Sequence, residues 1–176
     1  ASEKDILALY KAADEFGTLG ALVNNAGIVG PSVRVEDMSA ERIQRMMAVN
    51  VTGSILCARE AVKRMSTRRG GKGGVIVNLS SVLGIVGGDD DFATHAYAAS
   101  KAGIIGLSRA MAAYYAPQGL RVNVIAPGLI ATPMSQRAQD DPHILARLAQ
   151  LQPLTGAMGT PEDIADVWRI IEDLPR

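Results

Sequence analysis

Tyr97 and Lys101 are the two residues of this sequence whose types and spacing best suit acid–base chemistry. Residues four apart on a helix share one face, about 6 Å apart along the axis. A phenol with its ordinary pKa of about 10 is a poor proton donor and acceptor at neutral pH. A nearby ammonium favours the phenolate and lowers that pKa, as general acid–base catalysis needs. The same spacing also occurs in amphipathic helices that bury the aromatic ring and leave the lysine in solvent.

Small and polar residues follow each of three predicted strands. Asn24-Asn25-Ala26-Gly27 closes the first strand, Ser80-Ser81 the second and Pro127-Gly128 the third. Open α/β sheets bind ligands at the carboxyl ends of their strands. A sheet that served only as a core would need turns there, but no particular amides or hydroxyls. The pattern therefore favours a ligand site at this edge of the sheet.

The elements that must position these groups alternate along the chain. Apolar runs of strand length alternate with longer segments of helical period, which is typical of βαβ units and a parallel sheet. We expect strands at 21–24, 75–80 and 121–126, and helices at 6–16, 40–65 and 95–116. Thr160-Pro161-Glu162-Asp163 predicts another helix start, with a threonine cap, an early proline and an acid at the third helical position. Three parallel strands leave both outer strands unpaired, so the sheet is expected to be incomplete.

The ordered set of these motifs resembles the catalytic portion of a classical short-chain dehydrogenase/reductase. The set comprises Asn24-Asn25-Ala26-Gly27, Asn50 within Val49-Asn50-Val51-Thr52-Gly53, Ser81, Tyr97 with Lys101, and Pro127-Gly128. The resemblance implies one Rossmann-like domain over 1–176, a doubly wound parallel sheet with helices on both faces. It also implies a variable substrate lid at about 129–160. The implied activity is hydride transfer between NAD or NADP and a carbonyl or secondary alcohol.

The resemblance assigns catalytic roles to four residues. Tyr97 is the implied proton donor to the substrate oxygen, and Lys101 lowers its pKa and hydrogen-bonds the nicotinamide ribose. Ser81 holds the carbonyl oxygen and stabilises the charge that develops there. Asn50 interrupts its helix slightly and holds a water that connects Lys101 with solvent.

The resemblance also implies a set of cofactor contacts. Asn24, Ala26 and Gly27 are expected to pack against the adenosine side and to stabilise the sheet. Pro127, Gly128 and Thr132 are expected to line the nicotinamide, together with Tyr97 and Lys101. The cofactor supplies the hydride, while the protein supplies position and electrostatics.

The sequence departs from the family pattern at both ends. The family's glycine-rich dinucleotide turn, which faces the pyrophosphate, has no counterpart here, and neither does its last strand. We therefore expect this sequence to be part of a longer chain, and the choice between NAD and NADP stays open. The alternative is a truncated, catalytically dead remnant that serves as an interaction or structural module.

Four other features each allow a structural and a chemical interpretation. Cys57 is expected to be a packing residue rather than a nucleophile. The loop 68–74 is expected to be a solvated connector rather than a phosphate cradle, and Asp89–Asp91 a solvated turn rather than a cation site. His95 is expected to begin a helix, with substrate contact as the alternative.

Composition restricts the partners of the protein. The 176 residues carry a formal net charge of zero, which gives no electrostatic reason to expect nucleic acid or an anionic membrane surface as a partner. The single cysteine cannot form an internal disulfide, so a cytoplasmic location is expected. The resemblance implies a homo-oligomer, a dimer or tetramer, formed through the helices at 40–65 and 95–116. An apolar stripe there is equally consistent with packing inside one chain.

Overall fold

The computed structural model describes residues 2–92 and 94–173. Residues 1, 93 and 174–176 of the expected single domain lie outside the described part. The longer helices, in chain order, are α1 (Glu3–Phe16), α2 (Ala40–Met47), α3 (Gly53–Met65), α4 (His95–Tyr115) and α8 (Pro161–Asp173). Three short helices precede α8, namely α5 (Gln136–Gln139), α6 (Pro142–Ala146) and α7 (Leu148–Leu151).

A parallel sheet of three strands forms the centre of the molecule. The strands are β1 (Ala21–Asn24), β2 (Gly74–Leu79) and β3 (Leu120–Ile125), hydrogen-bonded in the order β1-β2-β3. Their register places Asn24 of β1 opposite Asn78 of β2. The prediction of a parallel α/β sheet is confirmed, and the carboxyl ends of the strands share one edge.

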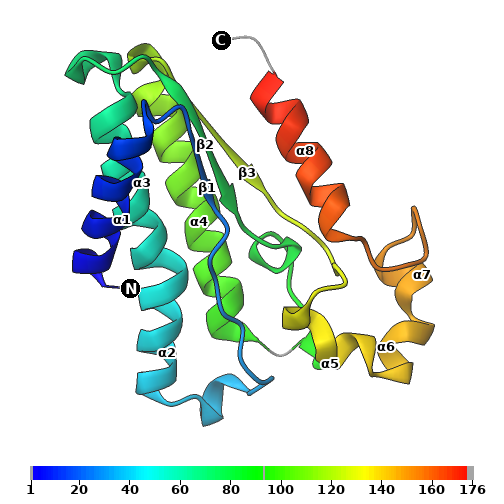
Figure 1. Ribbon diagram of the computed structural model, residues 1–176. Helices are drawn as coiled ribbons and strands as arrows, with labels where there is room; N and C mark the ends of the chain where they lie inside the picture. Colours follow the sequence, from blue (N-terminus) through cyan, green and yellow to red (C-terminus); the bar gives the residue numbers. More distant parts are fainter. Residues whose placement is uncertain (1, 93, 174–176) are drawn as a thin grey trace.

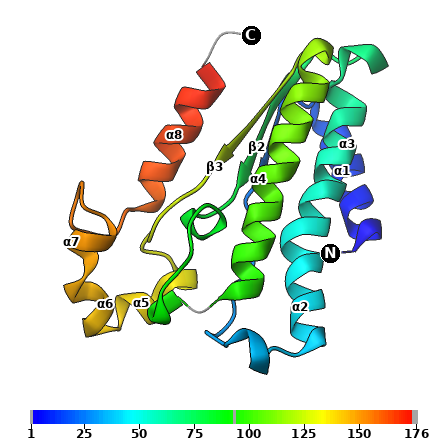
Figure 2. The same ribbon diagram turned by 180° about the vertical axis from the view of Figure 1, so that it is seen from behind.

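Helices cover both faces of this sheet, as expected. Ile76 is fully buried on one face among residues of α1, α3 and α4, including Met65 and Met111. Val75 and Val77 point to the other face, where Trp168 of α8 packs. Figure 1 shows α1, α3 and α4 on one side and α8 on the other, and Figure 2 gives the reverse view. Because side chains alternate along a strand, an uninterrupted apolar run serves both layers.

Side-chain caps set where the helices begin. The Ser39 hydroxyl accepts from the Arg42 amide at 3.2 Å and starts α2. The Thr160 hydroxyl accepts from the Asp163 amide, while the Asp163 carboxylate accepts from the Thr160 amide at 2.7 Å. This reciprocal pair satisfies two backbone N–H groups that have no partner inside the helix. The predicted start of α8 is therefore confirmed.

The helix expected over 40–65 is divided by a wider turn. Residues Ala48–Thr52 adopt π-helical geometry between α2 and α3. An inserted turn of this kind displaces one side chain relative to the regular helix. The displaced turn contains Asn50, so the slight interruption expected at that residue is confirmed.

The glycine-rich loop 68–74 is a connector, but it is not fully solvated. Gly73 has φ +79 and lies against the backbone of Gly119, where an added Cβ would come within 2.5 Å of the carbonyl oxygen. An added Cβ at Gly71 would come within 2.4 Å of Met65 backbone atoms. The glycines therefore allow the ends of α3 and β3 to approach closely. Among the described residues, no helix combines the length and apolarity that crossing a bilayer requires.

Candidate active site

Tyr97 and Lys101 lie one turn apart near the start of α4, on the face directed at β2. The Lys101 side chain is buried, and its Nζ donates to the Leu79 carbonyl at 2.8 Å. The same Nζ lies 5.6 Å from the centroid of the Tyr97 ring. The alternative of a solvent-facing lysine is wrong, because the strand end supplies an acceptor inside the molecule.

Ser81 meets Tyr97 from the carboxyl end of β2. The chain turns there into a short 3-10 helix, Val82–Gly84, whose Leu83 amide donates to the Ser81 hydroxyl at 3.2 Å. An added Cβ at Gly84 would lie 2.8 Å from the backbone of Lys101 and Ala102. Only a residue without a side chain lets this turn lie so close to α4. The neighbouring Ser80 hydroxyl donates to the Lys101 carbonyl at 2.8 Å and fastens the same contact.

Asn50 connects the π-helical turn to the loop after β1 and to α4. Its Oδ1 accepts from the Ile28 amide at 2.8 Å, and its Nδ2 donates to the Ile28 carbonyl at 2.9 Å. Nδ2 also lies 3.0 Å from the Ser100 hydroxyl. This fully buried amide therefore fixes three segments relative to one another.

Gly27 lies beside Asn50 and Lys101, and because it has no side chain it leaves the space next to them open. An added Cβ there would lie 3.4 Å from both Asn50 Oδ1 and Lys101 Nζ. The structure therefore brings Gly27, Asn50, Ser81, Tyr97 and Lys101 together, as the spacing of the strand ends predicts. Ala26 is exposed in the same loop.

Burial dominates the electrostatics of this cluster. It raises the pKa of Tyr97, and a hydrogen bond with the Ser81 hydroxyl opposes that shift. Burial also lowers the pKa of Lys101, because an ammonium loses hydration there. The Tyr97 pKa therefore lies above its ordinary value, because burial outweighs the hydrogen bond from Ser81. A lowering of that pKa by the Lys101 ammonium stays a prediction.

Asn24 faces the interior of the sheet. Its Nδ2 donates to Asn78 Oδ1 at 2.8 Å and to the Ser54 carbonyl at 3.3 Å. Asn78 Nδ2 in turn donates to the Ser108 hydroxyl of α4 at 2.9 Å. Asn24 was expected both to contact the cofactor and to stabilise the sheet, and this chain of buried amides supports the second role. The sequence motifs did not indicate Asn78, although a single amide inside the apolar run 75–79 is the signal that could have identified it.

The residues after β3 form the base of the segment 129–160. The Pro127 carbonyl accepts from the Val82 amide at 2.9 Å, which joins this strand end to the Ser81 turn. The Leu129 amide donates to Gln152 Oε1 at 2.8 Å, and the Gln152 side chain covers Gly128. The Thr132 amide donates to the Ser135 hydroxyl at 3.1 Å. Gln152, which the motifs did not indicate, therefore holds the two ends of this segment together.

The remaining candidates have structural surroundings. Cys57 packs against the core beside α1, and burial raises the pKa of its thiol, as suits a packing residue. His95 is exposed at the first position of α4. Among the described residues, no group of histidine, cysteine and carboxylate side chains could hold a metal ion.

Comparison with known proteins identifies the family. The family model described as enoyl-(acyl carrier protein) reductase matches residues 1–171. This chain belongs to the short-chain dehydrogenase/reductase family. Its fold agrees, since a 3-oxoacyl-[acyl-carrier protein] reductase from Brucella melitensis superposes with a TM-score of 0.84 at 34% identity, over 98% of this chain and 63% of that one.

Relatives within the short-chain dehydrogenase/reductase family differ in their named activities. The uncharacterized oxidoreductase YgfF of Escherichia coli is 47% identical over 133 residues, 75% of this chain and 53% of that protein. The cis-4-hydroxycyclohexanecarboxylate dehydrogenase of Sinomonas cyclohexanicum is 38% identical over 165 residues, 93% of this chain and 63% of that protein. The chain thus spans between half and two thirds of the length of these two relatives.

Proposed function

We propose that this chain supplies the catalytic residues of an NAD(P)-dependent oxidoreductase that interconverts a carbonyl and a secondary alcohol. The contact of Ser81, Tyr97 and Lys101 at the carboxyl ends of the strands is the observation that carries the proposal. The Ser81 hydroxyl and the Tyr97 phenol meet there, and the buried Lys101 ammonium lies close to the Tyr97 ring. This set can bind a substrate oxygen and exchange a proton with it.

In the reducing direction, Tyr97 gives its proton to the substrate oxygen as that oxygen gains negative charge. The Ser81 hydroxyl donates its single proton to the same oxygen while negative charge develops there. Once that oxygen is protonated, the Ser81 hydroxyl can donate to the Tyr97 phenolate instead. Lys101 stabilises the phenolate through its charge, which acts strongly because the site excludes water. Asn50 keeps the turn 48–52 and α4 in register and is proposed to hold the water through which the proton is replaced.

The residues present fit a nicotinamide nucleotide. Lys101 Nζ has three N–H groups, and among the described residues only the Leu79 carbonyl takes one of them. The other two can meet the ribose hydroxyls across the space that Gly27 leaves open. Asn24, Ala26 and Gly27 are assigned to the adenosine side, and Pro127, Gly128 and Thr132 to the nicotinamide. When bound, NAD or NADP supplies the hydride.

The named substrates of relatives support a secondary alcohol or the matching ketone, acyclic in 2-(S)-hydroxypropyl-CoM dehydrogenase 3 and cyclic in several others. The cyclic substrates include cis-4-hydroxycyclohexanecarboxylate, 2,5-dichloro-2,5-cyclohexadiene-1,4-diol and a 3β-hydroxysteroid. One solved relative, ElxO with NADPH bound, is 27% identical with a TM-score of 0.84 and supports the cofactor class. The domain is proposed to be single, with residues 129–160 as the lid over the substrate.

Replacement of Tyr97 by phenylalanine tests the proposal. The ring and its packing stay while the proton is lost, so carbonyl reduction should fall by about 10²- to 10⁴-fold. The rate is measured from the absorbance of the reduced nicotinamide with a panel of cyclic and acyclic ketones. Tyr114→Phe is the matched control on the same helix, since this side chain is 63% exposed. A Tyr97→Phe protein that retains the rate of the Tyr114→Phe protein would exclude this mechanism.

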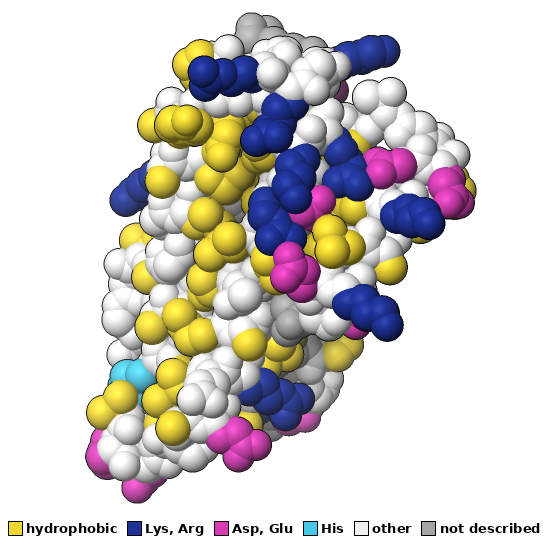
Figure 3. All heavy atoms as spheres, turned by 90° about the vertical axis from the view of Figure 1, so that its left-hand side faces the viewer, with side chains coloured by type: hydrophobic (Ala, Val, Ile, Leu, Met, Phe, Trp, Pro, Cys, Tyr) yellow, Lys and Arg dark blue, Asp and Glu magenta, His cyan; other side chains and the backbone are white. Residues whose placement is uncertain are grey.

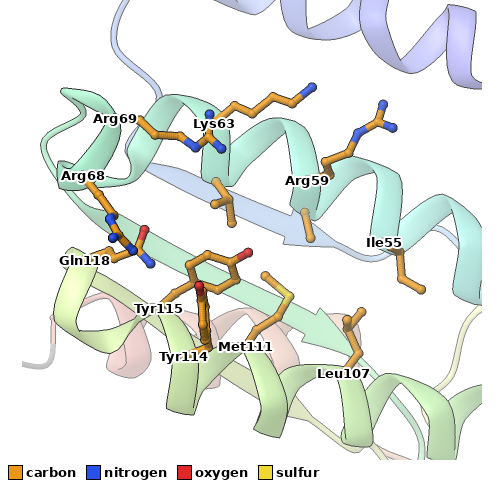
Figure 4. Close-up of a pocket in the computed structure, with 12 residues that line it drawn as sticks. Ile55, Arg59, Lys63, Arg68, Arg69, Leu107, Met111, Tyr114, Tyr115 and Gln118 are labelled. Atoms are coloured by element: carbon orange, nitrogen blue, oxygen red, sulfur yellow. The ribbon is translucent and has the colours of Figure 1, made fainter.

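A groove between α3 and α4, lined by apolar side chains and also by Arg59, Lys63, Arg68 and Arg69, supports the homo-oligomer. It has a volume of about 620 Å³ and is lined in part by Ile55, Leu107 and Met111. Figure 3 shows apolar side chains gathered in a stripe beside a row of arginines and lysines on this side of the molecule. Figure 4 shows Ile55 and Met111 reaching into the space between the two helices. A second copy that buries this stripe would remove it from water.

The assembly has its own test. Ile55→Glu should shift the protein to the monomer in sedimentation experiments, because a charge at the centre of an apolar interface loses its hydration. Leu154→Glu is the control, as Leu154 is 96% exposed and lies outside the groove. Unchanged assembly in Ile55→Glu would place the interface elsewhere.

A further inference from the structure

Three consecutive aspartates precede α4, and each contacts an arginine from a distant part of the chain. Asp90 pairs with Arg34, which follows β1, at 2.8 Å. Asp89 and Asp91 both pair with Arg147, through different nitrogens of one guanidinium. The expectation of a solvated turn holds for Asp90, whose side chain is 89% exposed, but not for Asp91, whose side chain is 18% exposed.

Arg147 stands at the junction of α6 and α7, inside the segment 129–160. Its guanidinium holds the pKa of Asp89 below its usual range. Two more contacts join the same pair of segments: His143 Nδ1 lies 3.3 Å from an Asp91 carboxylate oxygen, and Arg137 donates to the Asp91 carbonyl. Without the arginine, Asp89 and Asp91 would repel each other across a short turn.

These charges attach the outer part of the segment to the loop before α4. At its base, Gln152 holds Leu129, and Ile130 bridges to Gly159. Farther out, Ile144 and Leu148 are buried, while neither belongs to the cores that cover the two faces of the sheet. The ion pairs and hydrogen bonds of Asp89 and Asp91 therefore join these short helices to the loop that leads into the Tyr97 helix.

We infer that Arg147 is a positioning residue, which holds the lid closed over the substrate side of Tyr97 by binding Asp89 and Asp91. The inference rests on the proposed function for what lies beneath the lid. The attachment itself depends only on the contacts above. A bidentate arginine between two carboxylates fixes orientation as well as distance, which a lysine cannot fully replace.

Hydrogen–deuterium exchange of the purified protein tests the attachment without cofactor or substrate. In Arg147→Met, amides of 142–152 should exchange about three- to tenfold faster, as expected for a partly exposed charge-assisted pair. Amides of β2 and β3 should be unchanged. Arg147→Lys should fall between Arg147→Met and the unaltered protein. Arg169→Met is the matched control, because Arg169 pairs with Asp166 on its own helix.

The double variant Asp89→Asn, Asp91→Asn separates attachment from other roles of Arg147. If the pair is the attachment, this variant should accelerate lid exchange as Arg147→Met does, and combining all three changes should add nothing further. Unchanged lid exchange in either variant would overturn the inference. Equal acceleration in the lid and the strands would also overturn it, because the effect would then be global unfolding.

Steady-state kinetics distinguish positioning from a purely structural role, because a purely structural change would not alter KM for the ketone selectively. In a protein that turns over, Arg147→Met should raise KM for the ketone about three- to tenfold and leave the dissociation constant of the nicotinamide nucleotide unchanged. Arg147→Lys should recover part of that loss. A fall in kcat with unchanged KM would overturn the positioning role. A protein without any turnover would refute the proposed function alone, since the exchange result stands independently.

Discussion

The Tyr97 cluster and the lid over 129–160 are held by different kinds of contact. Around Tyr97, the fully or nearly buried side chains of Asn50, Asn78 and Lys101 make hydrogen bonds to the backbone and to other buried side chains, such as those of Ser100 and Ser108. Around the lid, partly exposed arginines meet aspartates. A buried polar group that loses its partner costs far more free energy than an exposed ion pair. The proposed catalytic cluster is therefore held by the core, whereas the proposed lid is held by weaker contacts at the surface.

Among the variants that test this comparison, the largest effect is expected where the Ser81 turn touches α4. In Gly84→Ala, the new methyl meets backbone that cannot move without shifting Lys101, so kcat should fall about 100-fold. The matched control is Gly87→Ala in the same loop, where the described residues leave an added Cβ open space. Steady-state rates of the two variants measure the difference. Equal rates would mean that the turn tolerates displacement and that the cluster is not rigid.

A smaller effect is expected within the buried amide chain. Asn78→Ala removes one of the two acceptors of the Asn24 amide and the amide that donates to the Ser108 hydroxyl, and should lower the free energy of unfolding by about 1–3 kcal/mol. Asn123→Ala in β3 is the control, because Asn123 is less buried and its side chain makes no hydrogen bond to other described residues. Urea denaturation measures both. A larger loss in Asn123→Ala would contradict the role given to the chain of amides.

The pH dependence of the oxidation and reduction rates tests the Tyr97 cluster. Alcohol oxidation requires the Tyr97 phenolate, and burial raises the pKa of Tyr97 above its ordinary value. Oxidation should therefore rise about tenfold per pH unit across the neutral and mildly alkaline range, while reduction, which uses the phenol, stays level there. Because the Ser81 hydroxyl lowers the Tyr97 pKa, Ser81→Ala should move the oxidation profile to higher pH. A profile that moves to lower pH would show that this hydrogen bond acts in the opposite sense.

The smallest effect is expected at the exposed ion pair beside the lid. Asp90→Asn removes the pair with Arg34, whose side chain is 54% exposed, and should change the free energy of unfolding by less than about 0.5 kcal/mol. Thermal unfolding at low and high salt measures it. A loss above about 1 kcal/mol would mean that this pair, like the amide chain, belongs to the fixed part of the molecule.

The sequence by itself determined the order of elements, the parallel sheet and the common edge on which the strand ends meet. These follow from local patterns: uninterrupted apolar strands, the Ser39 and Thr160 caps, and the four-residue spacing of Tyr97 and Lys101. The family followed from the order of the same motifs.

Only the tertiary structure decided the direction of the Tyr97 pKa shift, the role of Asn78 and the attachment of the lid through Arg147. Each depends on burial or on partners about 30 to 60 residues away in the chain. A pKa depends on how much water surrounds the group, and an ion pair depends on which loops meet. The spacing of neighbouring residues encodes neither the hydration of a group nor the meeting of two loops, because both arise only when the whole chain folds.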